Sequence, residues 1–255
     1  MSDPVKVWFE REDHLLRLRL DRPKANILDA ALVGALDRAL VEHGEQPGLL
    51  GILIDASGPH FSFGASVEEH LPAQCAGMLA GFHRLILRLV KSTVSVMMAV
   101  RGQCLGGGLE LVSAGHLIFA SPDARLGQPE IQIGVFAPAA SCLLPERIGL
   151  ADAEDLLISG RSITAEEAFR VGLITAVVPD PEAAALDYFD KHLALKSPSS
   201  LRFAVRAARN SLAGRMTARL AEVEQLYLDE LMSTRDAVEG LEAFLAKRPA
   251  RWSGN

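Results

Sequence analysis

The sequence has few cysteines, only three among 255 residues, and they are widely spaced: Cys75, Cys104 and Cys142. An odd number without a CxxC pair predicts neither a disulfide framework nor a zinc site, and it favours a reducing cytoplasm. The seven histidines show no HExxH or HxxxH spacing. That absence argues against a metal site and against a Ser-His-Asp triad, so we expect no bound metal.

A basic excess and a long apolar run are also missing. Lys and Arg number 26 against 32 Asp and Glu, which gives a net charge of −6 and argues against a nucleic-acid surface. The longest apolar run, residues 93–100, is far shorter than the roughly 20 residues that cross a membrane. The N-terminus lacks the apolar segment of a signal peptide. We therefore expect a cytoplasmic protein that binds neither nucleic acid nor a membrane.

Strand-like and helix-like segments alternate through the first part of the chain. Val5–Glu10 and Leu15–Leu20 predict a hairpin, since leucine alternates with arginine in the second segment. Further strands are predicted at 49–55, 94–100 and 117–120, with helices at 29–42 and 79–90. Asp29 is the expected N-cap of the first helix, and Gly44 lies past its end. This order predicts an α/β fold with largely parallel strands.

The last part of the chain changes to helical patterns. Asp180-Pro181 and Ser197-Pro198 each place a capping residue before proline, and Thr164 begins a capping box. Helices are predicted at 183–193, 201–212, 220–232 and 237–246. We place an α/β core at residues 1–195 and a helical region at 196–255.

Three consecutive glycines, Gly106 to Gly108, run into Glu110, and a second acid, Glu130, follows 20 positions later (130 − 110). Such glycines are either a tight turn or a place where backbone N–H groups approach a ligand, favourably at a helix start. Glu110 is either a helix-capping residue or a catalytic acid. Glu130 fits an exposed turn, but residues 131–136 look buried, which requires a carboxyl to be paired, protonated or functional. Dinucleotide and P-loop spacings both fail here.

The order of these signals along the chain resembles the crotonase (enoyl-CoA hydratase/isomerase) superfamily. The matching motifs are DRPKAN (21–26), FSFGA (61–65), AVRGQCLGGGLE (99–110), LGQPEI (126–131), GRSITAEEA (160–168) and EGLEAFLAKR (239–248). The resemblance implies a spiral of ββα units and a helical C-terminal trimerisation region, so that the chain forms a homotrimer or a hexamer. It also implies an acyl-CoA thioester substrate, whose CoA is part of the substrate, and no separate cofactor.

The same resemblance assigns roles to particular residues. The N–H groups of Ala65 and Gly107 would form the oxyanion hole, and Glu110 and Glu130 would hold and deprotonate water. Phe244 and Lys247 would contact CoA, either within the same chain or across a subunit boundary. The residues implied in binding the substrate or its CoA are Lys24, Ala25, Gly64, Ser66, Val67, Glu68, Gly106, Phe136, Pro138, Phe244 and Lys247.

Two departures from the family pattern narrow the substrate. Ser66 stands where the family often has Asp, and Pro138 stands where a glycine is usual. Because Pro138 cannot donate a backbone hydrogen bond, the floor of the acyl pocket should differ from that of a straight-chain hydratase. Residues 58–72 and 134–149 are similar to those members of the superfamily that hydrate a cyclic dienoyl-CoA in anaerobic aromatic degradation. The alternatives are a hydratase of linear 2-enoyl-CoA and a non-catalytic CoA-binding protein.

Overall fold

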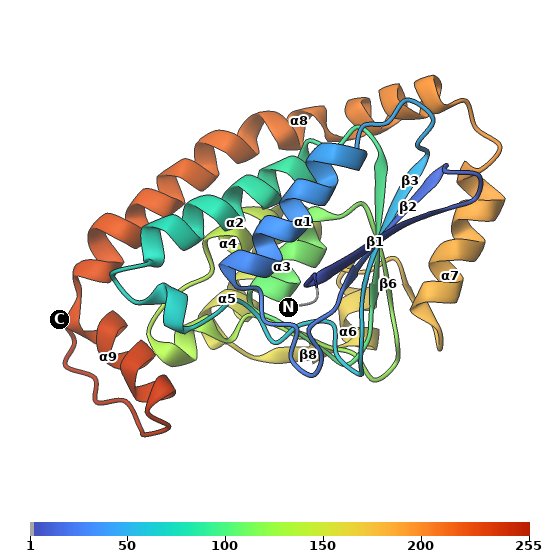
Figure 1. The fold of residues 1–255 in the computed structure, drawn as a ribbon. Helices are drawn as coiled ribbons and strands as arrows, with labels where there is room; N and C mark the ends of the chain where they lie inside the picture. The colour runs from blue at the N-terminus through green and yellow to red at the C-terminus, as the bar shows by residue number, and fades with distance from the viewer. Residues whose placement is uncertain (1–2) are drawn as a thin grey trace.

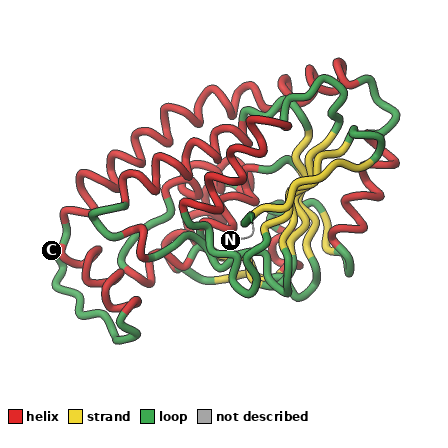
Figure 2. Tube along the Cα trace, in the orientation of Figure 1, coloured by secondary structure: helices red, strands yellow, loops and turns green. Residues whose placement is uncertain are grey.

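The computed structural model describes residues 3–255, and its centre is a six-stranded sheet (Figures 1 and 2). Its strand order is β1-β2-β3-β4-β6-β9, with only the β1–β2 pair antiparallel. The bounds are β1 Val5–Glu10, β2 Leu15–Leu20, β3 Gly51–Ala56, β4 Ser95–Val100, β6 Leu117–Ala120 and β9 Ala176–Val177. The predicted hairpin and the parallel pairing are confirmed.

Helices cover both faces of this sheet, most of them on one side (Figure 1). One core lies between the sheet and α1 to α4, and a smaller core lies under α7 on the opposite face. Their bounds are α1 Ala30–His43, α2 Cys75–Val90, α3 Gly107–Ala114, α4 Pro138–Ile148 and α7 Pro181–Tyr188. Asp29 caps α1 by accepting from the Leu32 N–H, as predicted.

A second, three-stranded sheet lies alongside the first, in the order β5-β7-β8. It consists of β5 Gln103–Leu105, β7 Arg125–Gly127 and β8 Ser162–Thr164. The chain passes from a strand of the large sheet to one of the small sheet and then to a helix: β4, β5, α3, and again β6, β7, α4. This repeat is the predicted ββα spiral, and it brings the starts of successive helices to one edge of the molecule.

The C-terminal helical region differs from its prediction in one respect. Instead of helices at 201–212 and 220–232, a single helix, α8 Pro198–Gln225, runs across α2 and α4 (Figure 1). The prediction of two helices was wrong because the helix continues through Gly214 and buries Met216 and Leu220 against the rest of the molecule. Beyond α8 come a π-helical turn, Leu226–Glu230, a short turn, Leu231–Ser233, and α9, Arg235–Leu245.

Several shorter elements have no counterpart in the prediction. These are β5, β7, β8 and β9, helix α4, helix α5 (Leu150–Ser159), and two single turns, η1 (Glu68–His70) and η2 (Pro129–Ile133). Helix α6, Ala165–Arg170, begins at Thr164, whose side chain accepts from the Glu167 N–H as the capping box predicts. Among residues 3–255, no helix is both long and apolar enough to cross a membrane.

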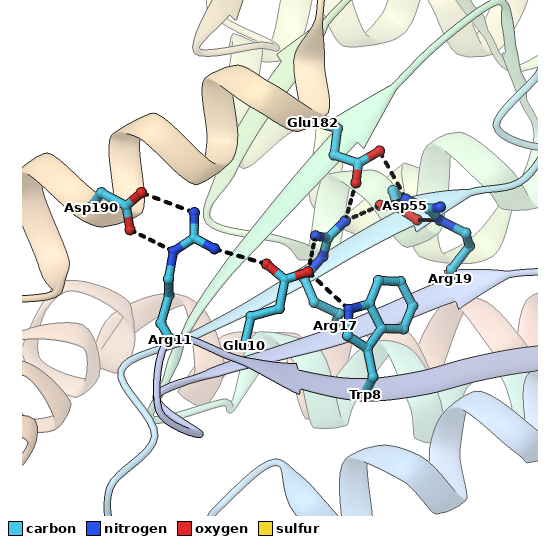
Figure 3. Close-up of polar contacts among 8 residues, drawn as sticks. All are labelled: Trp8, Glu10, Arg11, Arg17, Arg19, Asp55, Glu182 and Asp190. Carbon is cyan, nitrogen blue, oxygen red and sulfur yellow. Dashed lines mark hydrogen bonds and ion pairs between the residues drawn. The ribbon is translucent and has the colours of Figure 1, made fainter.

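An ion-pair network ties the hairpin to α7 on the outer face of the large sheet (Figure 3). Arg17 is 1% exposed and donates to Glu10, Asp55 and Glu182 at 2.8, 2.6 and 2.6 Å. Its guanidinium lies 4.8 Å from the centre of the Trp8 ring. A buried arginine needs such partners because unpaired charge is costly away from water.

Candidate active site

A cavity of about 360 Å³ opens where the helix starts converge, and most of the predicted site residues line it. Its walls come from the segment after β3, from α2, α3, η2 and the start of α4, and from α9. The predicted residues that line it are Gly64, Ala65, Val67, Gly106, Gly107, Glu110, Glu130, Phe136, Pro138 and Phe244.

The backbone N–H groups of Ala65 and Gly107 lie next to each other at the cavity wall. A Cβ placed on Gly107 would lie 3.1 Å from the Ala65 nitrogen, and Gly64 turns the chain there with φ of +109°. Gly107 is the first residue of α3, where an N–H has no partner within its own helix. Neither N–H donates to another group within residues 3–255. Two free donors side by side can hold one carbonyl oxygen, and the start of α3 favours negative charge on it.

The Glu110 side chain is 5% exposed and points across to another helix. Its Oε1 accepts from the Ala140 N–H at 2.8 Å, in the first turn of α4, so it does not cap its own helix. Burial raises the pKa of the Glu110 carboxyl, while the N–H groups of Ala139 and Ala140 act in the opposite direction. Pro138 is the first residue of α4, a position where its missing N–H costs nothing.

Glu130 lies in the first turn of η2 and faces the same space as Glu110. Its carboxyl lies so close to Gly106 that a Cβ there would meet Oε1 at 2.5 Å, and the φ of +51° at Gly106 also favours a glycine at this position. Burial raises the pKa of Glu130, and the neighbouring Glu110 carboxylate raises it further. Ile131 is 44% exposed, which corrects the expectation that residues 131–136 are buried. The pKa of Glu130 is therefore raised because its own carboxyl faces into the cavity, and not because residues 131–136 are buried.

Five predicted CoA-contacting residues lie outside the cavity: Lys24, Ala25, Ser66, Glu68 and Lys247. Ala25 is nevertheless close by, since its carbonyl accepts from the Phe63 N–H at 2.9 Å. Phe244 lines the cavity from α9 of the same chain. The contacts of these residues with CoA stay predictions.

Two residues of the site carry no role in the sequence-based prediction. Gln128 is 1% exposed, and with its amide nitrogen turned towards Glu130 it lies 3.0 and 3.1 Å from the two carboxyl oxygens. Its place two residues before Glu130 was the signal available in the sequence. His70 lines the cavity from η1 and gave no such signal, because its direction depends on that single turn.

Two donors facing a pair of carboxyls in one cavity define a site for acid–base chemistry on a carbonyl compound. The pKa of both carboxyls is raised above that of an exposed carboxyl, so the pair can hold one proton near neutral pH, where two exposed carboxyls would hold none. One group can then accept a proton from water while the other donates one. The fold and the site together thus describe a class of α/β proteins that polarise a carbonyl and move protons beside it.

The chain belongs to the enoyl-CoA hydratase/isomerase family, whose model matches residues 10–255. It is 61% identical to cyclohexa-1,5-dienecarbonyl-CoA hydratase of Thauera aromatica, over 98% of this chain and 97% of that protein. It is 34% identical to a probable enoyl-CoA hydratase of Rhizobium meliloti, over 96% and 97% of the two chains. The crystal structure of an enoyl-CoA hydratase from Mycobacterium avium superposes with a TM-score of 0.87 at 25% identity, covering 99% of this chain and 100% of that one.

Proposed function

We propose that the chain is a hydro-lyase that adds water to cyclohexa-1,5-diene-1-carbonyl-CoA and forms 6-hydroxycyclohex-1-ene-1-carbonyl-CoA, in anaerobic benzoyl-CoA degradation. The observation that carries the proposal is the 61% identity with the Thauera aromatica hydratase along nearly the whole chain. The probable enoyl-CoA hydratases of Rhizobium meliloti and Bacillus subtilis are only 34% and 30% identical. The carboxyl pair, the two free N–H groups and the largely apolar cavity wall all suit this reaction.

The thioester oxygen binds between the N–H groups of Ala65 and Gly107. A water molecule held by Glu110 and Glu130 gives up a proton to one carboxylate, and its oxygen bonds to the β-carbon of the ring. The electrons of the α,β double bond move towards the thioester, and the negative charge on its oxygen is stabilised by the two donors. Losing one such donor typically costs about 3–4 kcal/mol in the barrier.

The ring diene carries this charge further than a linear enoyl group does. Conjugation spreads the enolate over the second double bond, so the proton can arrive at the distal γ-carbon. A new double bond then forms between the α-carbon and its other ring neighbour, and the result is net 1,4-addition of water. The second carboxyl, which is protonated at the start, donates this proton, and the pair ends with the same net charge because the first carboxylate has taken the proton from water.

The cavity wall suits a ring because the start of α4 forms part of it, at the position where the family pattern has a flexible, glycine-rich segment. Pro138 fixes the backbone at the first residue of α4, and Phe136 adds an aromatic wall just before it. This rigid floor places the acyl group beside the Glu110 carboxyl, which the same helix holds through Ala140.

The proposal also includes a homotrimer or hexamer built through the helical region. Support comes from large apolar side chains left exposed there, with Phe203 67% and Leu226 45% exposed. Light scattering of the purified protein measures the mass directly. A monomer at micromolar concentration would contradict this part of the proposal.

The assay that tests the function compares kcat/KM on cyclohexa-1,5-diene-1-carbonyl-CoA with kcat/KM on crotonyl-CoA, with the product identified by mass and NMR spectra. We expect a strong preference for the ring diene. A preference for crotonyl-CoA would favour a linear 2-enoyl-CoA hydratase. Tight CoA binding without turnover of either thioester would favour a non-catalytic protein.

A further inference from the structure

Among the described residues that line the cavity, His70 is the only histidine, and the proposed reaction does not use it. It is the last residue of η1, the turn that follows Ala65 of the proposed oxyanion hole. The wall beside it is apolar, formed by Met78, Leu79 and Phe82. A polar ring atom on such a wall needs a partner when the cavity is filled, because unpaired buried polar groups are costly.

The orientation of the ring is fixed by two contacts. Nδ1 lies 2.7 Å from the carbonyl oxygen of Ser66, and a carbonyl only accepts, so Nδ1 carries the proton. The ring centre lies 6.4 Å from that of Tyr227, which in turn lies 5.1 Å from Phe136. Burial lowers the pKa of His70, which keeps the imidazole neutral.

A neutral imidazole protonated on Nδ1 leaves Nε2 as a hydrogen-bond acceptor. Nε2 makes no hydrogen bond to the described residues 3–255, and the side chain faces the cavity. The ring diene is a hydrocarbon and offers no polar hydrogen to this atom. The product carries a hydroxyl group, whose hydrogen needs an acceptor while its oxygen remains free to accept from the carboxyl pair.

We propose that His70 is a specificity-determining residue whose Nε2 accepts a hydrogen bond from the hydroxyl group of the hydroxyacyl product. This inference rests on the proposed hydratase function and deepens it. The bond distinguishes the hydroxyacyl thioester from the diene at the same site. His70 thereby sets how strongly product competes with substrate.

The test compares wild type with His70→Leu and His70→Gln in initial-rate assays. It measures KM for the diene and the inhibition constant of the hydroxy product. For His70→Leu we expect the inhibition constant to rise about three- to tenfold, the scale of one lost neutral hydrogen bond, while KM changes less than twofold. The amide of His70→Gln can donate to Ser66 and accept from the product, so it should restore most of the product affinity. Met78→Leu is the matched control for a change in cavity shape without loss of an acceptor.

Equal changes in KM, kcat and the inhibition constant for His70→Leu would overturn the inference, because a purely structural role through Ser66 acts on all three. An unchanged inhibition constant would overturn it too. If His70→Leu does not fold, His70→Phe removes the same acceptor. If wild type does not hydrate the ring diene, the proposed function fails, and crotonyl-CoA with its 3-hydroxyacyl product then tests His70 independently.

Discussion

Replacing Gly107 with alanine should abolish the polarisation of the thioester while leaving the fold intact. The added Cβ would lie 3.1 Å from the Ala65 nitrogen and 3.2 Å from the Ala65 Cβ. These distances are tight, so the methyl group occupies the space between the two donors. The backbone at Gly107 is the ordinary first residue of a helix, not a left-handed turn, so alanine adds no strain in the backbone dihedral angles and only the contacts with Ala65 must adjust.

The size of the effect follows from the donors that are lost. Removing one oxyanion donor costs about 3–4 kcal/mol, which is roughly a hundred- to a thousandfold in kcat. Gly107→Ala obstructs the oxygen's position between both donors, so we expect a loss at or above the upper end. Alanine has a higher helix propensity than glycine, so the melting temperature should stay close to that of wild type.

The assay is steady-state hydration of the ring diene, with circular dichroism and thermal unfolding as folding checks. Gly214→Ala is the matched control, because it makes the same change inside a helix where nothing lies within 4 Å. We expect Gly214→Ala to keep full activity. Folded Gly107→Ala with more than a tenth of the wild-type kcat/KM would refute the assignment of this oxyanion hole.

Three further predictions follow from the packing and charges. The folded state raises the pKa of Glu130 above its value of about 4.3 in the unfolded chain. Wild type therefore loses stability as pH rises from the unfolded to the folded pKa, because the carboxyl must then ionise in the folded protein. Glu130→Gln has no such group, so it should melt at a higher temperature than wild type at alkaline pH. That gap should close as pH falls towards the usual carboxyl range; a constant gap would contradict the pKa argument. Arg17→Met leaves Asp55 with one arginine fewer and should lower the free energy of unfolding by about 3 kcal/mol, seen in urea titration, with kcat/KM unchanged. Deleting residues 252–255 removes the Asn255 main-chain oxygen that accepts from the Arg235 N–H at 2.9 Å, which should loosen α9 and raise KM severalfold; an unchanged KM would show that the tail does not support the site.

Local chemistry in the sequence was enough to predict much of the fold. The hairpin, the capping of α1 by Asp29 and the starts of α7 and α8 all depend on residues that are neighbours in the chain. The continuity of α8 could not be predicted in this way. It depends on the burial of Met216 and Leu220 against the rest of the molecule, which outweighs the weak helix propensity near Gly214.

In the candidate site, too, contacts between neighbours in the chain could be predicted and contacts between distant residues could not. Gly107 and Glu110 share one helix turn, so their proximity could be read from the sequence. The bond from Ala140 to Glu110 joins residues that are 30 positions apart, and it exists because α4 begins at Pro138. From the sequence, Pro138 was interpreted as the loss of a backbone hydrogen-bond donor. In the structure it is the first residue of the helix whose N–H groups hold the acid.

The kcat of Glu110→Gln and of Glu130→Gln on the ring diene is the most direct test of the paired-carboxyl mechanism. Each substitution keeps the size of the side chain and removes its ability to exchange a proton. We predict a fall of at least about a hundredfold for each, the usual scale for loss of a catalytic acid or base, with both variants folded and still binding the thioester. A folded variant with near-normal turnover would contradict the mechanism and remove that glutamate from it.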